Sequence, residues 1–471
     1  MRRLDRTWCI PALLATALFS PAAPAAPAAL PPVLEDTLGR DRALEQLARL
    51  AVDVDEAAAT AARARLRAAG PAGLAAFERA HAAALDAAAR AIEDAAGAPF
   101  DRSDPAGLAE PGRARLLAAL DVVCAQKDCV LSRLYWHTDL AEATRRAQAE
   151  NKPILSLRLL GDLNEELSCA NSRFFRALLY PHPVVRELLR QRFVLHWSSE
   201  RPAPKLTIDL GDGRTVTSTI TGNSAHYVLD EAGRPIDVIP GLESPRVFLD
   251  ALLRAESLAR ASAGFDADAR RDALARYHAR RLTDLDAEWK RELAAVGERG
   301  RPAPQARRGG GPAPRAGEAA PIAITKSAVE VPVLLDLDEP IAPDPAAGRF
   351  DRLARAHAPA IALARASLGL MRTQQWRSGD VARDAADFAA AQDGLRRTLA
   401  LDTLRNEHEI HREIHGWFAS GAAAPLDLAA LSRRVYDELF LTPRSDPWLG
   451  LADPATYAGL VGGGRRAQAR L

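Results

Sequence analysis

The chain has 471 residues, a formal net charge of +1, 48% hydrophobic residues and 26% charged residues. These values are typical of a soluble globular protein with more than one core. The nearly neutral charge gives no reason to expect binding to nucleic acid or acidic lipid, and no phosphate-binding glycine loop or G-x-S-x-G elbow is present.

The first 28 residues have the form of a signal peptide. MRRLDR is a positive start, TWCIPALLATALFS is an apolar core, and PAAPAAPAA offers small residues for cleavage. We therefore expect export to the periplasm or secretion. The apolar core is too short for a comfortable membrane span, and no later segment looks transmembrane, so no stable membrane insertion is expected after cleavage.

Residues 34–130 are rich in alanine and are predicted to be helical. One apolar stripe at helical spacing comprises Leu44, Leu47, Leu50 and Val54. Near the end of this region, Cys124 and Cys129 lie five residues apart, and a turn would let them pair in an oxidising compartment. Such a pair is either a structural disulfide or a redox pair that serves Cys169.

The stretch 151–180 combines a buried-strand pattern, a helix start and a cysteine. Residues 154–160 (ILSLRLL) are almost continuously apolar, as in a buried strand. After a polar loop, Ser168 or Asn171 is expected to cap a helix. Cys169 therefore lies at or beside a helix N-terminus, where a thiolate is favoured.

The elements around this stretch are predicted from periodicity and turn chemistry. A helix capped by Thr138 or Asp139 precedes the strand. After Cys169 and its helix come a second helix at 183–190, a strand at 193–197, hairpins at 205–221 and 226–241, and a closing helix at 244–261 capped by Ser244.

This order of elements over residues 131–262 resembles the thioredoxin-like superfamily. The resemblance implies an α/β domain with Cys169 in the place of the reactive thiol. The motif here is Cys169-Ala170-Asn171-Ser172, so a hydroxyl replaces the second cysteine. The family's proline before the third strand also has no counterpart in residues 222–225. The remaining redox chemistry is that of a monothiol, whose thiolate attacks a disulfide or peroxide while Ser172 donates a hydrogen bond.

Beyond this domain the chain is mainly helical. Residues 263–297 are predicted to form a long helix, residues 298–321 a linker rich in Pro, Gly and Arg, and residues 322–471 a mainly helical C-terminal domain that begins with an extended piece.

The stretch DTLRNEHEIHREIHGWF contains three histidines, His408, His411 and His415. Glu407, His411 and His415 share one helix face and have the spacing to ligate a metal ion on successive turns. The H-E-x-x-H metalloprotease motif is absent. Partly buried structural histidines and acid–base chemistry are the alternatives.

The sequence therefore predicts an α+β protein in several parts, with a thioredoxin-like α/β domain between a helical N-terminal region and a mainly helical C-terminal region. The favoured function is a scaffold or protein-interaction module outside the cytoplasm. The alternatives are a monothiol redox protein that uses Cys169 and acts on protein thiols, and a metal-binding protein or hydrolase that uses Glu407, His411 and His415. No cofactor is expected.

Overall fold

The computed structural model describes residues 32–100, 103–219, 223–298, 304, 347–378 and 384–443. The expected signal peptide, nearly all of the 298–321 linker and the extended start of the C-terminal region lie outside the described residues. The chain divides into one unit of residues 1–43 and a compact unit of residues 44–471. Helix α1 (Pro32–Leu50) contains this boundary, and the elements below belong to the second unit.

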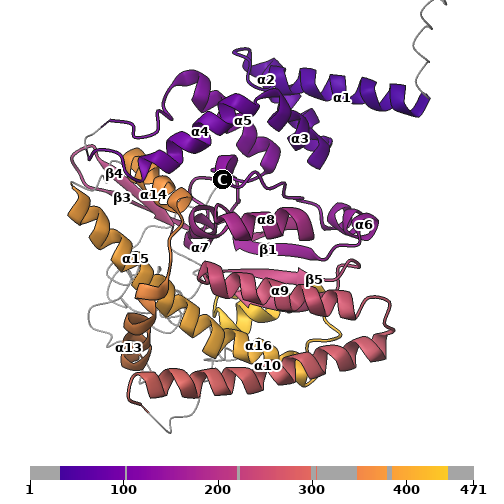
Figure 1. Cartoon of the computed structure of the whole chain (residues 1–471), viewed down its shortest axis with the longest axis vertical. Helices are drawn as coiled ribbons and strands as arrows, with labels where there is room; N and C mark the ends of the chain where they lie inside the picture. The colour runs from indigo at the N-terminus through magenta and orange to yellow at the C-terminus, as the bar shows by residue number, and fades with distance from the viewer. Residues whose placement is uncertain are drawn as a thin grey trace, which may run out of the picture. The chain divides into compact units, whose positions relative to one another are not determined.

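A mixed four-stranded sheet forms the centre of the second unit (Figure 1). Its strands are β1 (Ile154–Leu160), β2 (Val194–Arg201), β5 (Ser224–Leu229) and β6 (Pro235–Pro240), in the order β2-β1-β5-β6. β1 pairs with β2 in parallel and with β5 antiparallel, and β5 pairs with β6 antiparallel. β1 is buried along nearly its whole length, which explains its nearly continuous apolar sequence.

The helices that accompany the sheet follow the expected order: α6 (Leu140–Glu150), α7 (Ala170–Phe174), the π-helix η2 (Phe175–Leu179), α8 (Pro183–Arg192) and α9 (Pro245–Ala261). Asp139 caps α6 by accepting a hydrogen bond from the Glu142 amide. The N-cap of α7 is Cys169 itself, where the sequence pointed to Ser168 or Asn171, and Ser244 precedes α9 without a side-chain capping bond. The expected hairpin at 205–221 contains β3 (Lys205–Asp209) and β4 (Thr215–Thr219).

The N-terminal helices α2 (Glu56–Ala68), α3 (Pro71–Ala80), α4 (Ala82–Ala95) and α5 (Pro111–Cys124) build a second core. The predicted stripe is wrong at its end: Leu50 and Val54 are exposed, since α1 ends at Leu50 and helical spacing no longer applies beyond it. Helix α14 (Arg365–Ser378) joins this core through Ala366 and Leu370. A Cβ at Gly369 would lie 1.8 Å from the Ile92 carbonyl oxygen, so α14 and α4 approach closely.

The remaining helices of the described residues are the 3-10 helix η1 (Cys129–Leu131), α10 (Ala267–Ala295), α13 (Ala347–His357), the 3-10 helix η4 (Ala358–Ala360), α15 (Ala385–Arg405), the π-helix η5 (Asn406–His411), α16 (Arg412–Ala419), α17 (Leu428–Arg434) and the π-helix η6 (Val435–Leu439). Ile414, Phe418 and Leu431 belong to the same core as the sheet. Figure 1 shows α16 beside α10, with which it packs. The fold is therefore α+β with helices predominating, and the C-terminal helices share the cores of the preceding regions.

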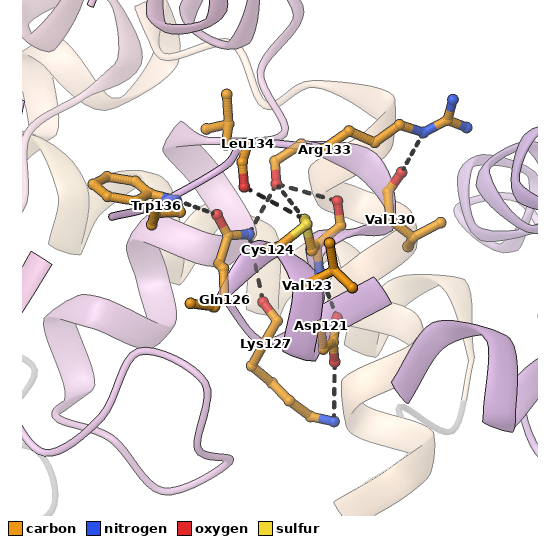
Figure 2. Close-up of a disulfide and its surroundings, with 12 residues drawn as sticks. Asp121, Val123, Cys124, Gln126, Lys127, Val130, Arg133, Leu134 and Trp136 are labelled. Atoms are coloured by element: carbon orange, nitrogen blue, oxygen red, sulfur yellow. Dashed lines mark hydrogen bonds and ion pairs between the residues drawn. A yellow bond between two sulfur atoms is a disulfide. The ribbon is translucent and has the colours of Figure 1, made fainter. Parts of the chain in front are cut away.

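Cys124 and Cys129 form a disulfide across the turn after α5 (Figure 2). Both residues are fully buried. The Cys129 amide donates to Asp121 Oδ1 over 2.9 Å, and the indoles of Trp136 and Trp197 donate to Gln126 Oε1 and to the Ala125 carbonyl, each over 2.9 Å. The bridge therefore holds a turn on which two tryptophans of the sheet core rest.

Among the described residues, no helix combines the length and the apolar character that crossing a membrane requires.

Candidate functional site

Cys169 is the free cysteine among the described residues, and its side chain is fully buried. Its amide donates to the Leu160 carbonyl over 3.1 Å, which ties it to the end of β1. Its Sγ lies 2.8 Å from Ser224 Oγ and 3.3 Å from Ser172 Oγ. The thiol thus faces two hydroxyl groups inside the protein, one from α7 and one from the start of β5.

The segment around Ser224 is covered by the C-terminal end of the described chain. Tyr436 O–H donates to the Asn223 carbonyl over 3.2 Å. Asn223 Nδ2 donates to the Phe440 carbonyl over 3.3 Å and to Thr442 Oγ1 over 3.1 Å. A reagent or a substrate disulfide therefore has to displace packed structure before it reaches Cys169.

A second polar pair lies deeper in the same core. Tyr180 Oη and His226 Nε2 are 2.8 Å apart, and both side chains are fully buried. Burial lowers the pKa of His226 to about 3 and raises the pKa of Tyr180 well above its usual value. His226 is therefore neutral at physiological pH, and its Nε2 shares a hydrogen bond with the Tyr180 hydroxyl.

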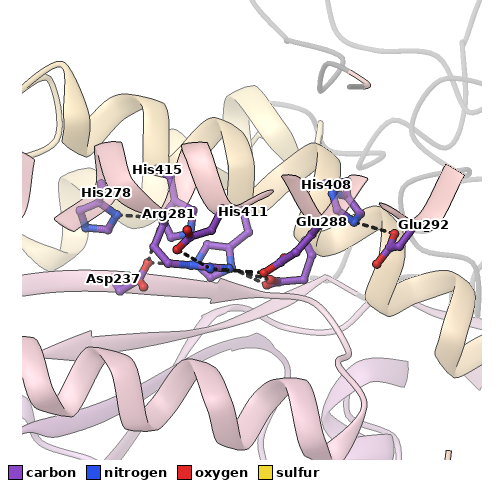
Figure 3. A network of polar contacts seen from close by, with 10 residues as sticks. Asp237, His278, Arg281, Glu288, Glu292, His408, His411 and His415 are labelled. Carbon is purple, nitrogen blue, oxygen red and sulfur yellow. Dashed lines mark hydrogen bonds and ion pairs between the residues drawn. The ribbon is translucent and has the colours of Figure 1, made fainter. Parts of the chain in front are cut away.

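A cluster of buried histidines and carboxylates lies where β6, α10 and the η5–α16 helix meet (Figure 3). His411 stands between two carboxylates: its Nδ1 is 2.7 Å from Glu407 Oε1, and its Nε2 is 3.0 Å from Asp237 Oδ1. Burial alone would lower the pKa of His411, but Asp237 and Glu407 outweigh burial and raise it to about 9. In the same way His411 overcomes the effect of burial on Glu407 and lowers its pKa to about 2.

His278 and His415 form the other half of the cluster. Their Nδ1 atoms are 2.7 Å apart, as the dashed line in Figure 3 marks. His278 Nε2 is 2.9 Å from the Ile236 carbonyl, and a carbonyl only accepts, so Nε2 carries the proton of a neutral His278. Burial lowers the pKa of His278 to about 4 and the pKa of His415 well below its usual value.

Arg281 adds a second positive charge on the other side of Glu407. Its Nη2 is 3.7 Å from Glu407 Oε2, and its Nη1 is 3.4 Å from Asp284. Charged His411 and Arg281 thus oppose the carboxylates of Asp237 and Glu407. His408 lies apart from the cluster, because its Nε2 pairs with Glu292 over 3.0 Å.

The structure therefore brings together Glu407, His411 and His415, the metal ligands predicted from the sequence. The three residues do not share one set of contacts. Glu407 and His411 pair with each other, while His415 contacts His278. Asp237 and His278 were missed because they come from β6 and α10, far away along the chain. Two sequence features could have pointed to them. Asp237 is a carboxylate within the apolar strand PIDVIP, and His278 is a histidine on the buried side of a long helix.

A cleft of about 270 Å³ opens on a different part of the surface. Its lining includes Leu74 of α3, Arg146 of α6, Arg190 of α8 and Leu195 of β2, together with Tyr135. It therefore joins the N-terminal helices to the sheet region and combines apolar walls with charged side chains.

The chain matches no protein-family model, no curated protein and no solved structure. The resemblance to the thioredoxin-like superfamily therefore rests on the order of elements and on the residues around Cys169. The structural features that bear on function are the enclosed thiol of Cys169, the histidine cluster and the cleft.

The enclosure of Cys169 predicts slow alkylation. In the mature native protein, Cys169 should react with iodoacetamide on the order of 100-fold more slowly than in guanidinium chloride, because reaction requires local or global opening. A matched control is Val54→Cys in a Cys169→Ala background, since Val54 is 80% exposed. Native Cys169 reacting as fast as this control would show that the thiol is accessible.

The buried state of His226 predicts a loss of stability in mild acid. The unfolded histidine has a pKa near 6.5 and the folded one about 3, so between these values only the unfolded chain takes up the proton. The contribution of neutral His226 to the free energy of unfolding is fully present above the pKa of the unfolded histidine. Lowering the pH from 7.5 to 5 should decrease the free energy of unfolding by about 1–2 kcal/mol through His226. Urea unfolding at both pH values should show a smaller loss for His226→Gln. An equal loss in the variant would contradict a neutral, buried His226.

Proposed function

We propose that this protein is an exported scaffold that binds a protein partner outside the cytoplasm, and that residues 131–262 form a thioredoxin-like domain without dithiol chemistry. The observation that carries the proposal is the enclosure of Cys169. A thiol that is fully buried between Ser172 and Ser224 acts as a small core side chain.

The order of elements supports the thioredoxin-like assignment. Helix α6, strand β1, the helices α7 to α8, strand β2, the β5–β6 hairpin and helix α9 follow one another as in the family that the sequence resembles. The parallel β1–β2 pair and the antiparallel β5–β6 pair lie side by side in one sheet. Cys169 follows β1 and precedes α7, which is the place of the family's thiol.

The Cys124–Cys129 disulfide supports export, because structural disulfides persist mainly in oxidising compartments. The bond also removes both cysteines as resolving partners for Cys169. They belong to the core of the N-terminal helices, whereas Cys169 belongs to the core of the sheet. The monothiol alternative would therefore need an external thiol and an opening of the structure around Ser224.

The cleft between α3 and the sheet region is the surface to which we assign partner binding. Arg190 lies on α8 and lines the cleft, 43% of its side-chain surface is exposed, and its Nη2 lies 3.6 Å from Glu78 Oε2, so Arg190→Ala removes one charge and one ion pair from the cleft. Cys169 lies in the buried core and does not line the cleft. Substitutions at Arg190 and at Cys169 therefore distinguish partner binding at the surface from a function of the thiol.

Partner capture from an envelope fraction tests the proposal. The wild type and Cys169→Ser should capture the same partner, identified by mass spectrometry, and Arg190→Ala should capture at least about tenfold less, as expected when an interface arginine is a hot spot. Matched circular dichroism and melting curves would establish that each variant is folded. Loss of capture by folded Cys169→Ser would favour the redox alternative, and capture by all three proteins would remove the cleft from the proposal.

A further inference from the structure

Three potential metal ligands from three separate elements converge in the core. Asp237 comes from β6, His278 from α10 and His415 from α16, and each is at most 1% exposed. One ligand atom from each lies within 4.8 Å of the others. Two imidazoles and one carboxylate form a donor set suited to Zn²⁺ and similar divalent transition metals, whereas Ca²⁺ and Mg²⁺ prefer oxygen ligands.

The hydrogen bonds around these residues orient them as ligands. Since the Nε2–H group of His278 donates to the Ile236 carbonyl, the lone pair of its Nδ1 faces His415 Nδ1, 2.7 Å away. A metal-bound histidine characteristically donates its other N–H group in this way. Asp237 Oδ1 also lies 3.9 Å from His415 Nδ1, so all three side chains point toward one small volume.

A second layer of contacts holds the carboxylate. His411 Nε2 is 3.0 Å from Asp237 Oδ1, and Glu407 holds the opposite nitrogen of His411 over 2.7 Å. The Val238 amide donates to the same Asp237 oxygen over 2.8 Å. These contacts fix the position of Asp237 without involving either of the other two ligand residues.

The two ring nitrogens of His415 differ in their surroundings, because only Nδ1 faces His278 and Asp237. Nε2 of His415 is buried and has no hydrogen-bond partner within the described part of the chain. A buried, unpaired polar atom destabilises a fold, and the short Nδ1–Nδ1 contact can share a single proton at most. A metal ion on both Nδ1 atoms would replace the proton that they share, and the proton of a neutral His415 would then lie on Nε2.

We propose that Asp237, His278 and His415 bind one structural divalent transition-metal ion of the Zn²⁺ class, which fastens α10 and α16 to β6. The burial of all three residues argues for a structural ion that enters during folding. The proposal is independent of partner binding at the cleft. It also differs from the Glu407, His411 and His415 set, since it places Glu407 and His411 as positioning residues.

Metal content and melting temperature test the site in the mature full chain without a polyhistidine tag. Wild-type protein unfolded in chelator and refolded with Zn²⁺ or Co²⁺ should retain about one equivalent after gel filtration. It should melt several degrees higher than protein refolded in chelator, because the ion binds the native state. The Co²⁺ form should show visible absorption bands of a nitrogen- and oxygen-ligated ion.

His278→Gln and His415→Gln should each lose the bound metal and the metal-dependent rise in melting temperature. His408→Gln is the matched control, because His408 is also a buried histidine but pairs with Glu292 of α10. This variant should retain one equivalent of metal. Wild type that binds less than about a tenth of an equivalent, or melts identically with and without metal, would overturn the proposal. Equal loss of metal in His408→Gln would overturn it as well. If the ligand variants do not fold, the wild-type Co²⁺ spectrum decides, and absence of its bands counts against the site.

Discussion

Some buried polar side chains of the sheet pair with residues of the C-terminal helices. Leaving such a group unpaired costs about 1–3 kcal/mol, so each pairing constrains how the helices pack. Asp237 of β6 meets His411 of η5, and Tyr227 of β5 donates to Ser432 of α17. These contacts join segments that are more than 150 residues apart in the sequence.

The same constraint explains the state of Cys169. In the thioredoxin-like arrangement that we propose, Cys169 is the thiol after the first core strand and Ser172 would take the place of a second cysteine. Ser224, from the neighbouring strand β5, completes its polar surroundings. Tyr436 donates a hydrogen bond to the Asn223 carbonyl, and the Asn223 side chain donates one to the Phe440 carbonyl. The C-terminal segment therefore covers this position. Cys169 is thereby part of the core, which is why we propose a function at the surface.

Much of the local structure could be predicted from the sequence, because apolar periodicity and turn residues act over short distances. The strand at 154–160, both hairpins and the long helix that begins after Asp266 follow from such patterns. The partnership of Asp237 with His411, and of His278 with His415, depends on tertiary packing and leaves no local pattern. The π-helical turns at Phe175–Leu179 and Asn406–His411 were also not predicted, since helical spacing alone does not distinguish them from an α-helix.

We expect the C-terminal helices and the sheet to form one cooperative unit that encloses Cys169 and the histidine cluster. Native-state hydrogen exchange of the mature chain tests it most directly, because it reports the free energy of opening for each segment. The slowest amides of β1, β5 and α16 should exchange through the same opening, with equal free energies of opening and equal dependence on denaturant. Exchange of α16 through a separate opening of much lower free energy would contradict a single cooperative unit. Cys169 and the histidine cluster would then become exposed while the sheet remains folded.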